Sequence, residues 1–176
     1  VDTLTTITSK RDERNYALEH PIPEDTVERI LDAGRLAGSA RNRQLWRFVV
    51  AESQEARASL AQTVFVASNV LDAGLVITIA TPADAGPANK NMILDAGRAA
   101  QNMMLAAWNE GIVSCPNGIP DTEGASAALR LLSDEQPLLV ISFAYPKHPR
   151  DPQSRTAAAW SRQADRKTLE TIVERV

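Results

Sequence analysis

The chain has 176 residues, of which 44% are hydrophobic, and this suits a single globular domain with a sizeable core. A net charge of −3 and a pI of about 5.4 disfavour a nucleic-acid-binding protein, which usually carries a basic stripe. The single cysteine, Cys115, allows no intramolecular disulfide and is typical of a cytoplasmic protein. No apolar run reaches the ~18 residues that a membrane helix needs, so we expect no membrane segment.

The segment SKRDERNY, residues 9–16, is unusual in an acidic chain because it gathers three cations within five positions. We expect Lys10, Arg11 and Arg14 to lie within about one helical turn, so that at least two of them converge on one anion. A phosphate monoester suits them, since Arg binds its oxygens through a planar fork and Lys as a point charge. The alternative is a solvated cluster that pairs with the neighbouring carboxylates.

The first half of the chain predicts helices and strands in alternation after this segment. Apolar residues recur at helical period after Pro23, which predicts a helix over residues 23–38. The next predicted elements are a polar loop at 39–45, a strand at 46–53, a helix at 54–64 and a strand at 73–81. The last of these is almost continuously apolar, so we expect helices to cover both of its faces.

Residues 92–111 predict the strongest helix, because apolar side chains almost encircle it. One face carries Ile93, Gly97, Ala100, Met104, Ala107 and Gly111, and another carries Met103 and Trp108. Such a helix is expected to be central, or to be covered partly by a partner subunit.

The remainder predicts a strand and turn at 112–120, a helix at 122–132, a strand at 136–146 and a short helix at 168–176. Between the last two lies a polar, proline-punctuated stretch that fits poorly inside one compact domain. We therefore expect residues 147–176 to form an extended tail that reaches a partner subunit.

Common catalytic motifs are absent from the sequence. There is no GxGxxG, Walker A, GxSxG or HExxH pattern, and two histidines with one cysteine do not make a zinc site. We therefore expect no catalytic side chain and no metal, and a cofactor that supplies the chemistry.

Four stretches, taken in order, resemble the FMN-dependent nitroreductase family of flavin oxidoreductases. They are residues 6–52, 95–116, 140–146 and 165–173, and together they run through nearly the whole chain. The resemblance implies an α+β fold: a nitroreductase-like α/β sandwich whose mostly antiparallel sheet is flanked by helices. It also implies one FMN-binding domain over residues 1–176 and an intertwined homodimer that exchanges its C-terminal tails.

The resemblance also assigns residues to FMN. Lys10 and Arg11 would contact the phosphate and ribityl chain, Arg14 the N1/C2=O edge of the ring, and Arg166 the phosphate from the other extremity of the chain. The loop after the second helix would contribute Ser39, Ala40 and Asn42. The loop after a short strand, Pro116, Asn117 and Gly118, would offer backbone N–H groups to the flavin N5 and O4.

Three positions depart from the family pattern. Lys10 stands where many members have arginine. Asp12 stands in place of a serine. Its carboxylate could accept a hydrogen bond from a ribityl hydroxyl or orient Arg11 or Arg14. It could also weaken phosphate binding. Leu45 stands in place of a proline. A side-chain amide that some members direct at the flavin, near Ser68 or Asn69, has no clear counterpart.

The implied function is reduction of a nitroaromatic, a quinone or a similar electron-poor acceptor by a ping-pong course, with NADH or NADPH as hydride donor. We expect a cytoplasmic homodimer that acts on small molecules and binds neither nucleic acid nor membrane. Three alternatives stay open: an FMN storage or regulatory protein without turnover, an oxygen-using enzyme of the dimethylbenzimidazole synthase type, and a structural dimer that has lost cofactor affinity.

Overall fold

An antiparallel sheet organises the chain in the computed structural model, which describes residues 2–18, 20–86, 89–149 and 163–176. Its strands are β1 (Arg47–Val50), β2 (Leu75–Pro82), β3 (Val113–Asn117) and β4 (Glu135–Ala144). Their spatial order is β1-β2-β4-β3, and each neighbouring pair is antiparallel. The four predicted strands and the α+β class are confirmed.

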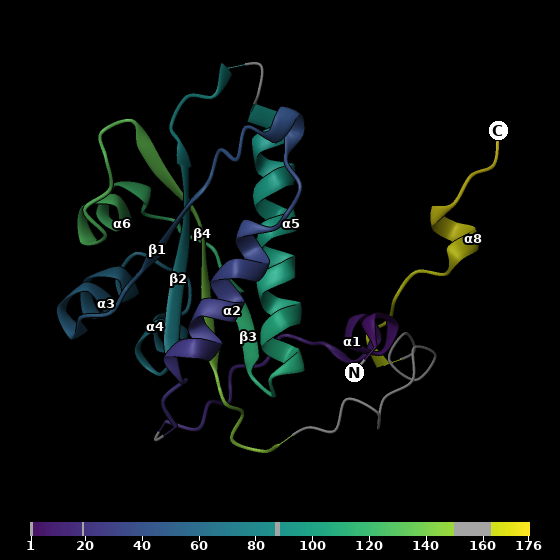
Figure 1. The fold of residues 1–176 in the computed structure, drawn as a ribbon, viewed down its shortest axis with the longest axis horizontal. Coiled ribbons are helices and arrows are strands. Elements are labelled where there is room, and N and C mark those ends of the chain that lie inside the picture. The colour runs from purple at the N-terminus through teal and green to yellow at the C-terminus, as the bar shows by residue number, and fades with distance from the viewer. Residues whose placement is uncertain (1, 19, 87–88, 150–162) are drawn as a thin grey trace.

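Helices cover both faces of this sheet (Figure 1). One face packs against α2 (Glu24–Arg35) and α5 (Asn89–Asn109), and the other packs against α3 (Gln54–Ala61), α4 (Ala67–Leu71) and α6 (Thr122–Ala128). At the periphery lie α1 (Thr3–Ser9), the 3-10 turn η1 (Ala40–Asn42) and α8 (Leu169–Ile172). No helix within the described ranges has the length and hydropathy to span a bilayer.

Strand β2 is the centre of the core. Val76 belongs to the apolar cluster beside α3, α4 and α6, whereas Ile77 and Ile79 belong to the cluster beside α2 and α5. All three side chains are fully buried. The prediction that helices cover both faces of this strand is therefore confirmed.

Helix α5 is central, as predicted, but the first turns of its predicted apolar face are exposed within one chain. Met103 packs closely against α2, where a Cβ added to Gly34 would come 2.2 Å from the Met103 Cε. Ile93 and the neighbouring Leu94 are 51% and 63% exposed, and Gly97 is exposed as well. The start of α5 thus presents apolar side chains that the rest of the described chain does not cover.

The segment after α1 is extended, so the predicted helical turn of cations is wrong. Asp12 forms a parallel bridge with Ser114 on the outer edge of β3, and the Glu13 N–H donates to the Ser114 carbonyl at 3.2 Å. The physical reason is that the edge of β3 offers backbone hydrogen bonds, while this polar segment has no apolar stripe to support a helix. The indole N–H of Trp108 donates to Ser9 Oγ at 2.8 Å, which ties the end of α1 to α5.

The predicted tail is described only in part, since residues 150–162 lie outside the described ranges. Helix α8 stands away from the sheet (Figure 1), with Leu169 and Ile172 70% and 62% exposed. Its apolar side chains thus have no cover from the described part of their own chain.

Candidate functional site

A cavity of about 720 Å³ lies where the segment after α1 meets α5 and β3. The residues that line it are Lys10, Arg11, Asp12, Glu13, Gln101, Met104, Pro116 and Arg166. Five of the residues predicted from the sequence therefore meet at one place, although Arg166 is more than 150 positions from Arg11 in the chain.

Each cation in the opening segment has a nearby acidic partner or acceptor. The Lys10 ammonium group pairs with the Asp12 carboxylate and lies 3.6 Å from the Met104 Sδ. Arg11 Nη2 lies 3.7 Å from a Glu13 carboxylate oxygen. Of the roles that the sequence leaves open for Asp12, an ion pair with Arg11 or Arg14 is not seen among the described residues, since its carboxylate pairs with Lys10.

Arg14 contacts β3 outside the group of residues that line the cavity. Its Nε lies 3.3 Å from the Cys115 Sγ, and this hydrogen bond is the main reason that the pKa of Arg14 is raised above its ordinary value. The Asn69 side-chain amide donates to the same sulfur at 3.6 Å. The thiol thus links the opening segment, α4 and β3.

Asn69 carries a buried side-chain amide to which the sequence analysis assigned no contact. It is 2% exposed and sits on α4, a short helix that was not predicted either. The signal in the sequence is the polar pair Ser68 and Asn69 within the otherwise apolar stretch of residues 64–71, which indicates a buried polar group with a partner.

The segment from Pro116 to Gly118 was predicted as a loop, and this is wrong for its first two residues, which end β3. The Asn117 side-chain amide donates to the Val66 carbonyl at 2.9 Å, and the Phe65 N–H donates to the Gly118 carbonyl at 3.2 Å. Pro116 has no N–H, so only the backbone of Asn117 and Gly118 can donate to a ligand.

The loop residues that were predicted to contact FMN do not line the cavity of about 720 Å³, which we call the basic cavity. These residues are Ser39, Ala40 and Asn42. The Ala40 N–H donates to the Asp95 carboxylate at 2.8 Å, near the start of α5. Met104 lies nine positions later, about 13 Å along the helix axis. Within one chain this loop therefore meets α5 nearer to the start of the helix than the part that lines the basic cavity, Gln101 and Met104.

The backbone of this loop is unusual. Arg41, Asn42 and Gln44 have φ values of 55°, 54° and 52°, a left-handed conformation that costs free energy for a residue with a side chain. Ser39 Oγ accepts a hydrogen bond from the Gln44 N–H at 3.0 Å. This bond and the one to Asp95 hold the loop in a fixed shape.

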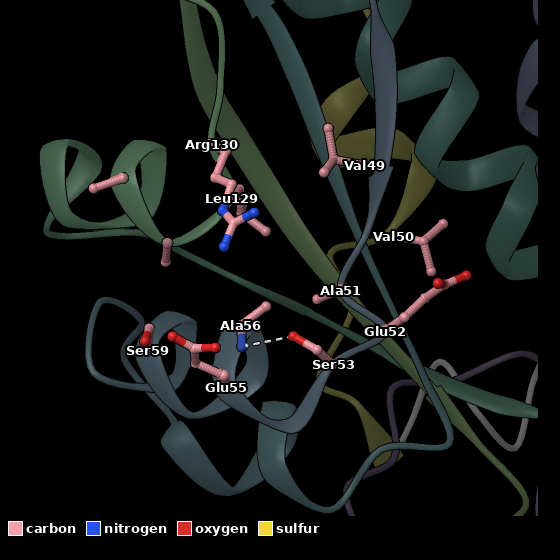
Figure 2. Close-up of a pocket in the computed structure, with 12 residues that line it drawn as sticks. Val49, Val50, Ala51, Glu52, Ser53, Glu55, Ala56, Ser59, Leu129 and Arg130 are labelled. Carbon is pink, nitrogen blue, oxygen red and sulfur yellow. Dashed lines mark hydrogen bonds between the residues drawn. The ribbon is translucent and has the colours of Figure 1, made fainter.

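A second hollow, of about 660 Å³, opens between β1, α3 and α6 (Figure 2). Its polar groups include Glu52, Glu55 and Arg130, which are exposed. Ser53 Oγ caps α3 by accepting from the Ala56 N–H at 3.1 Å. None of the predicted site residues lines this hollow, so the candidate site is the basic cavity.

Tyr16, close to Arg14, predicts a loss of stability at alkaline pH that can be measured. Burial raises the pKa of its phenol above the ordinary value of 10. Above about pH 10 the unfolded chain then releases this proton more readily than the folded chain, so the free energy of unfolding should fall as pH rises. Urea unfolding at several pH values should show this fall, and Tyr16→Phe should make it shallower. An equal slope in both proteins would contradict the assignment.

Comparison with known proteins agrees with this fold. The model of the Nitroreductase family matches residues 7–72 and 66–145. The chain therefore belongs to the nitroreductase family.

Individual relatives point the same way. The chain is 29% identical over 153 residues to the "Putative NADH dehydrogenase/NAD(P)H nitroreductase" of Archaeoglobus fulgidus, with 84% of this chain and 87% of the relative covered. A nitroreductase family protein from Clostridium difficile 630 has the same fold, with a TM-score of 0.81 and 20% identity over 99% of this chain and 98% of that one. An FMN-dependent nitroreductase from Clostridium difficile R20291 gives a TM-score of 0.71 and 22% identity, with 85% and 90% covered.

Proposed function

We propose that the protein is an oxidoreductase that uses FMN to pass reducing equivalents from NADH or NADPH to an electron-poor acceptor such as a nitroaromatic or a quinone, by a ping-pong course. The observation that carries this proposal is the convergence of Lys10, Arg11 and Arg166 on one cavity. Three cationic side chains suit a phosphorylated ligand, and the family membership and the names of the relatives support FMN as that ligand.

The residues of the chain would divide the work of holding the cofactor. Lys10, Arg11 and Arg166 bind the phosphate, and Arg14, fixed by Cys115, supplies a positive charge beside β3. Bound FMN accepts and donates hydride, so the protein needs no acid or base of its own. Its part is to bind, to orient the two substrates in turn and to limit the access of water.

We further propose that Ser39, Ala40 and Asn42 reach the cofactor of a second copy. In a two-fold dimer each surface meets its own counterpart, so antiparallel α5 helices place the Ser39 loop of one subunit beside the basic cavity of the other. Exposed apolar side chains of α1, α5 and α8 support such a contact: Leu4, Ile7, Ile93, Leu94, Leu169 and Ile172. The tail over residues 147–176 is proposed to cross between the subunits.

The lone Cys115, which has no disulfide partner within the chain, supports a reducing, cytoplasmic location for this enzyme.

An anaerobic titration tests the proposed function. The full chain is loaded with FMN, freed of excess cofactor and titrated with NADH or NADPH while the visible flavin absorbance is followed. We expect the absorbance to bleach and to return when a quinone or nitroaromatic is added. A chain that does not take up FMN would contradict the proposal. A bound flavin that neither donor reduces would favour a storage protein, and dimethylbenzimidazole formed in air would favour the synthase.

A further inference from the structure

The basic cavity contains its own counter-ions. Among the described residues that line it, three are cationic and two, Asp12 and Glu13, are acidic. A phosphate monoester carries about 1.5 to 2 negative charges at neutral pH. The excess of one positive charge is therefore smaller than the charge of the ligand that the cavity is proposed to hold.

The two carboxylates differ in what they do. Glu13 accepts hydrogen bonds from the backbone and side-chain nitrogens of Asn15, at 3.4 Å and 3.1 Å, so its carboxylate is anchored in a local turn. Asp12 pairs with the ammonium group of Lys10. The Lys10 side chain is only 9% exposed, and its other contact of this kind is the weakly accepting sulfur of Met104. Asp12 thus takes one of the three N–H donors that the ammonium group of Lys10 could offer to phosphate oxygens, and it places a negative charge beside them.

Asp12 cannot move far from this position. Its backbone is joined to Ser114 on the edge of β3, and the next residue donates its N–H to the Ser114 carbonyl. Its side chain is 52% exposed, on the open side of the cavity. A bound phosphate group would therefore meet a negative charge beside the lysine, on a backbone that is held to β3.

We propose that Asp12 limits the affinity of the cavity for phosphorylated ligands by acting as the internal counter-ion of Lys10. FMN must displace this pair or share its lysine, so the cofactor exchanges with solution and is not held permanently. The inference depends on the proposed FMN-binding function and adds that the phosphate end is the weak point of that binding.

Affinities for FMN and for riboflavin, which lacks the phosphate, test this inference. Both are measured by flavin fluorescence on the full chain without cofactor, for the native protein and for Asp12→Asn. We expect the variant to bind FMN about three to ten times more tightly, because one close repulsion is removed, and to bind riboflavin equally well.

Two control variants separate the effect of the Lys10–Asp12 ion pair from the effect of the net charge. Glu13→Gln removes the same charge from the same cavity. It releases Arg11 only from a longer contact of 3.7 Å and leaves Lys10 paired, so its gain in FMN affinity should be smaller. Glu55→Gln, on the far face of the sheet, should change neither affinity. An equal gain in Glu13→Gln would overturn the role of the Lys10 pair. Thermal unfolding confirms that each variant is folded.

The remaining outcomes show whether a failure concerns the inference about Asp12 or the proposed function on which it rests. If the native protein binds FMN and Asp12→Asn binds it no more tightly, the inference fails and the proposed function stands. If only Asp12→Asn binds FMN, the limiting effect of Asp12 on affinity is confirmed, but the proposed function of the native chain is overturned. If neither protein binds FMN or riboflavin, both proposals are overturned.

Discussion

Replacing Arg11 and Arg166 together by alanine is expected to raise the Kd for FMN by at least about a hundredfold, because a hydrogen bond to a charged group contributes about 1.5–3 kcal/mol. Both guanidinium groups line the same cavity, from segments far apart in the chain. Fluorescence titration of the cofactor-free protein gives the Kd directly. Riboflavin affinity should change much less, since the lost groups are assigned to the phosphate.

The matched control for this variant removes two positive charges from another surface. Arg29 and Arg35 of α2 form exposed ion pairs with Asp25 and Asp32, and such pairs contribute little to stability. Their double replacement by alanine should leave the Kd for FMN within about twofold. If both double variants weakened FMN equally, the effect would come from net charge and the assignment of the cavity would be wrong.

Trp108→Ala is expected to reduce the free energy of unfolding by about 3–5 kcal/mol, the usual cost of truncating a buried aromatic residue to alanine. The indole is 6% exposed and packs in the cluster that contains Tyr16 and Val113. Its N–H also holds Ser9, directly before Lys10. The variant should therefore weaken FMN binding as well, because the start of the cavity loses its anchor. Urea unfolding measures the first effect and cofactor titration the second.

Trp108→Phe separates the two contributions of this residue. Phenylalanine keeps most of the buried apolar surface but cannot donate to Ser9, so we expect a loss of about 1 kcal/mol, the typical contribution of one hydrogen bond. A loss in Trp108→Phe as large as in Trp108→Ala would show that the hydrogen bond dominates and that packing does not.

Local pattern was enough to predict the elements with a strong period or a continuous apolar run. Helix α2 follows from its apolar stripe after Pro23, and β2 follows from its uninterrupted apolar residues. Helix α4 was missed because its five residues are too short to show a helical period. The exposed start of α5 was not told apart from its buried part, because periodicity does not distinguish a face covered by the same chain from one left open.

The site was predictable in its residue types but less so in its geometry. Three cations in five positions indicated an anion site, whereas their extended backbone depends on pairing with Ser114, a hundred positions away. The pair between Lys10 and Asp12 depends on the same backbone. That Arg166 meets Arg11 was implied by family resemblance, since no local pattern carries information about so distant a contact.

The distance in sequence between Arg11 and Arg166 has a consequence for biosynthesis. Ribosomes make the chain from its N-terminus, so the first wall of the cavity, the sheet and most helices are synthesised well before the second wall. A nascent polypeptide that has reached β4 has its hydrophobic core but an incomplete pocket. If the chain binds FMN as proposed, the cofactor meets both walls of the cavity only after the segment that carries Arg166 has been translated, so the sheet and its helices form without help from bound flavin.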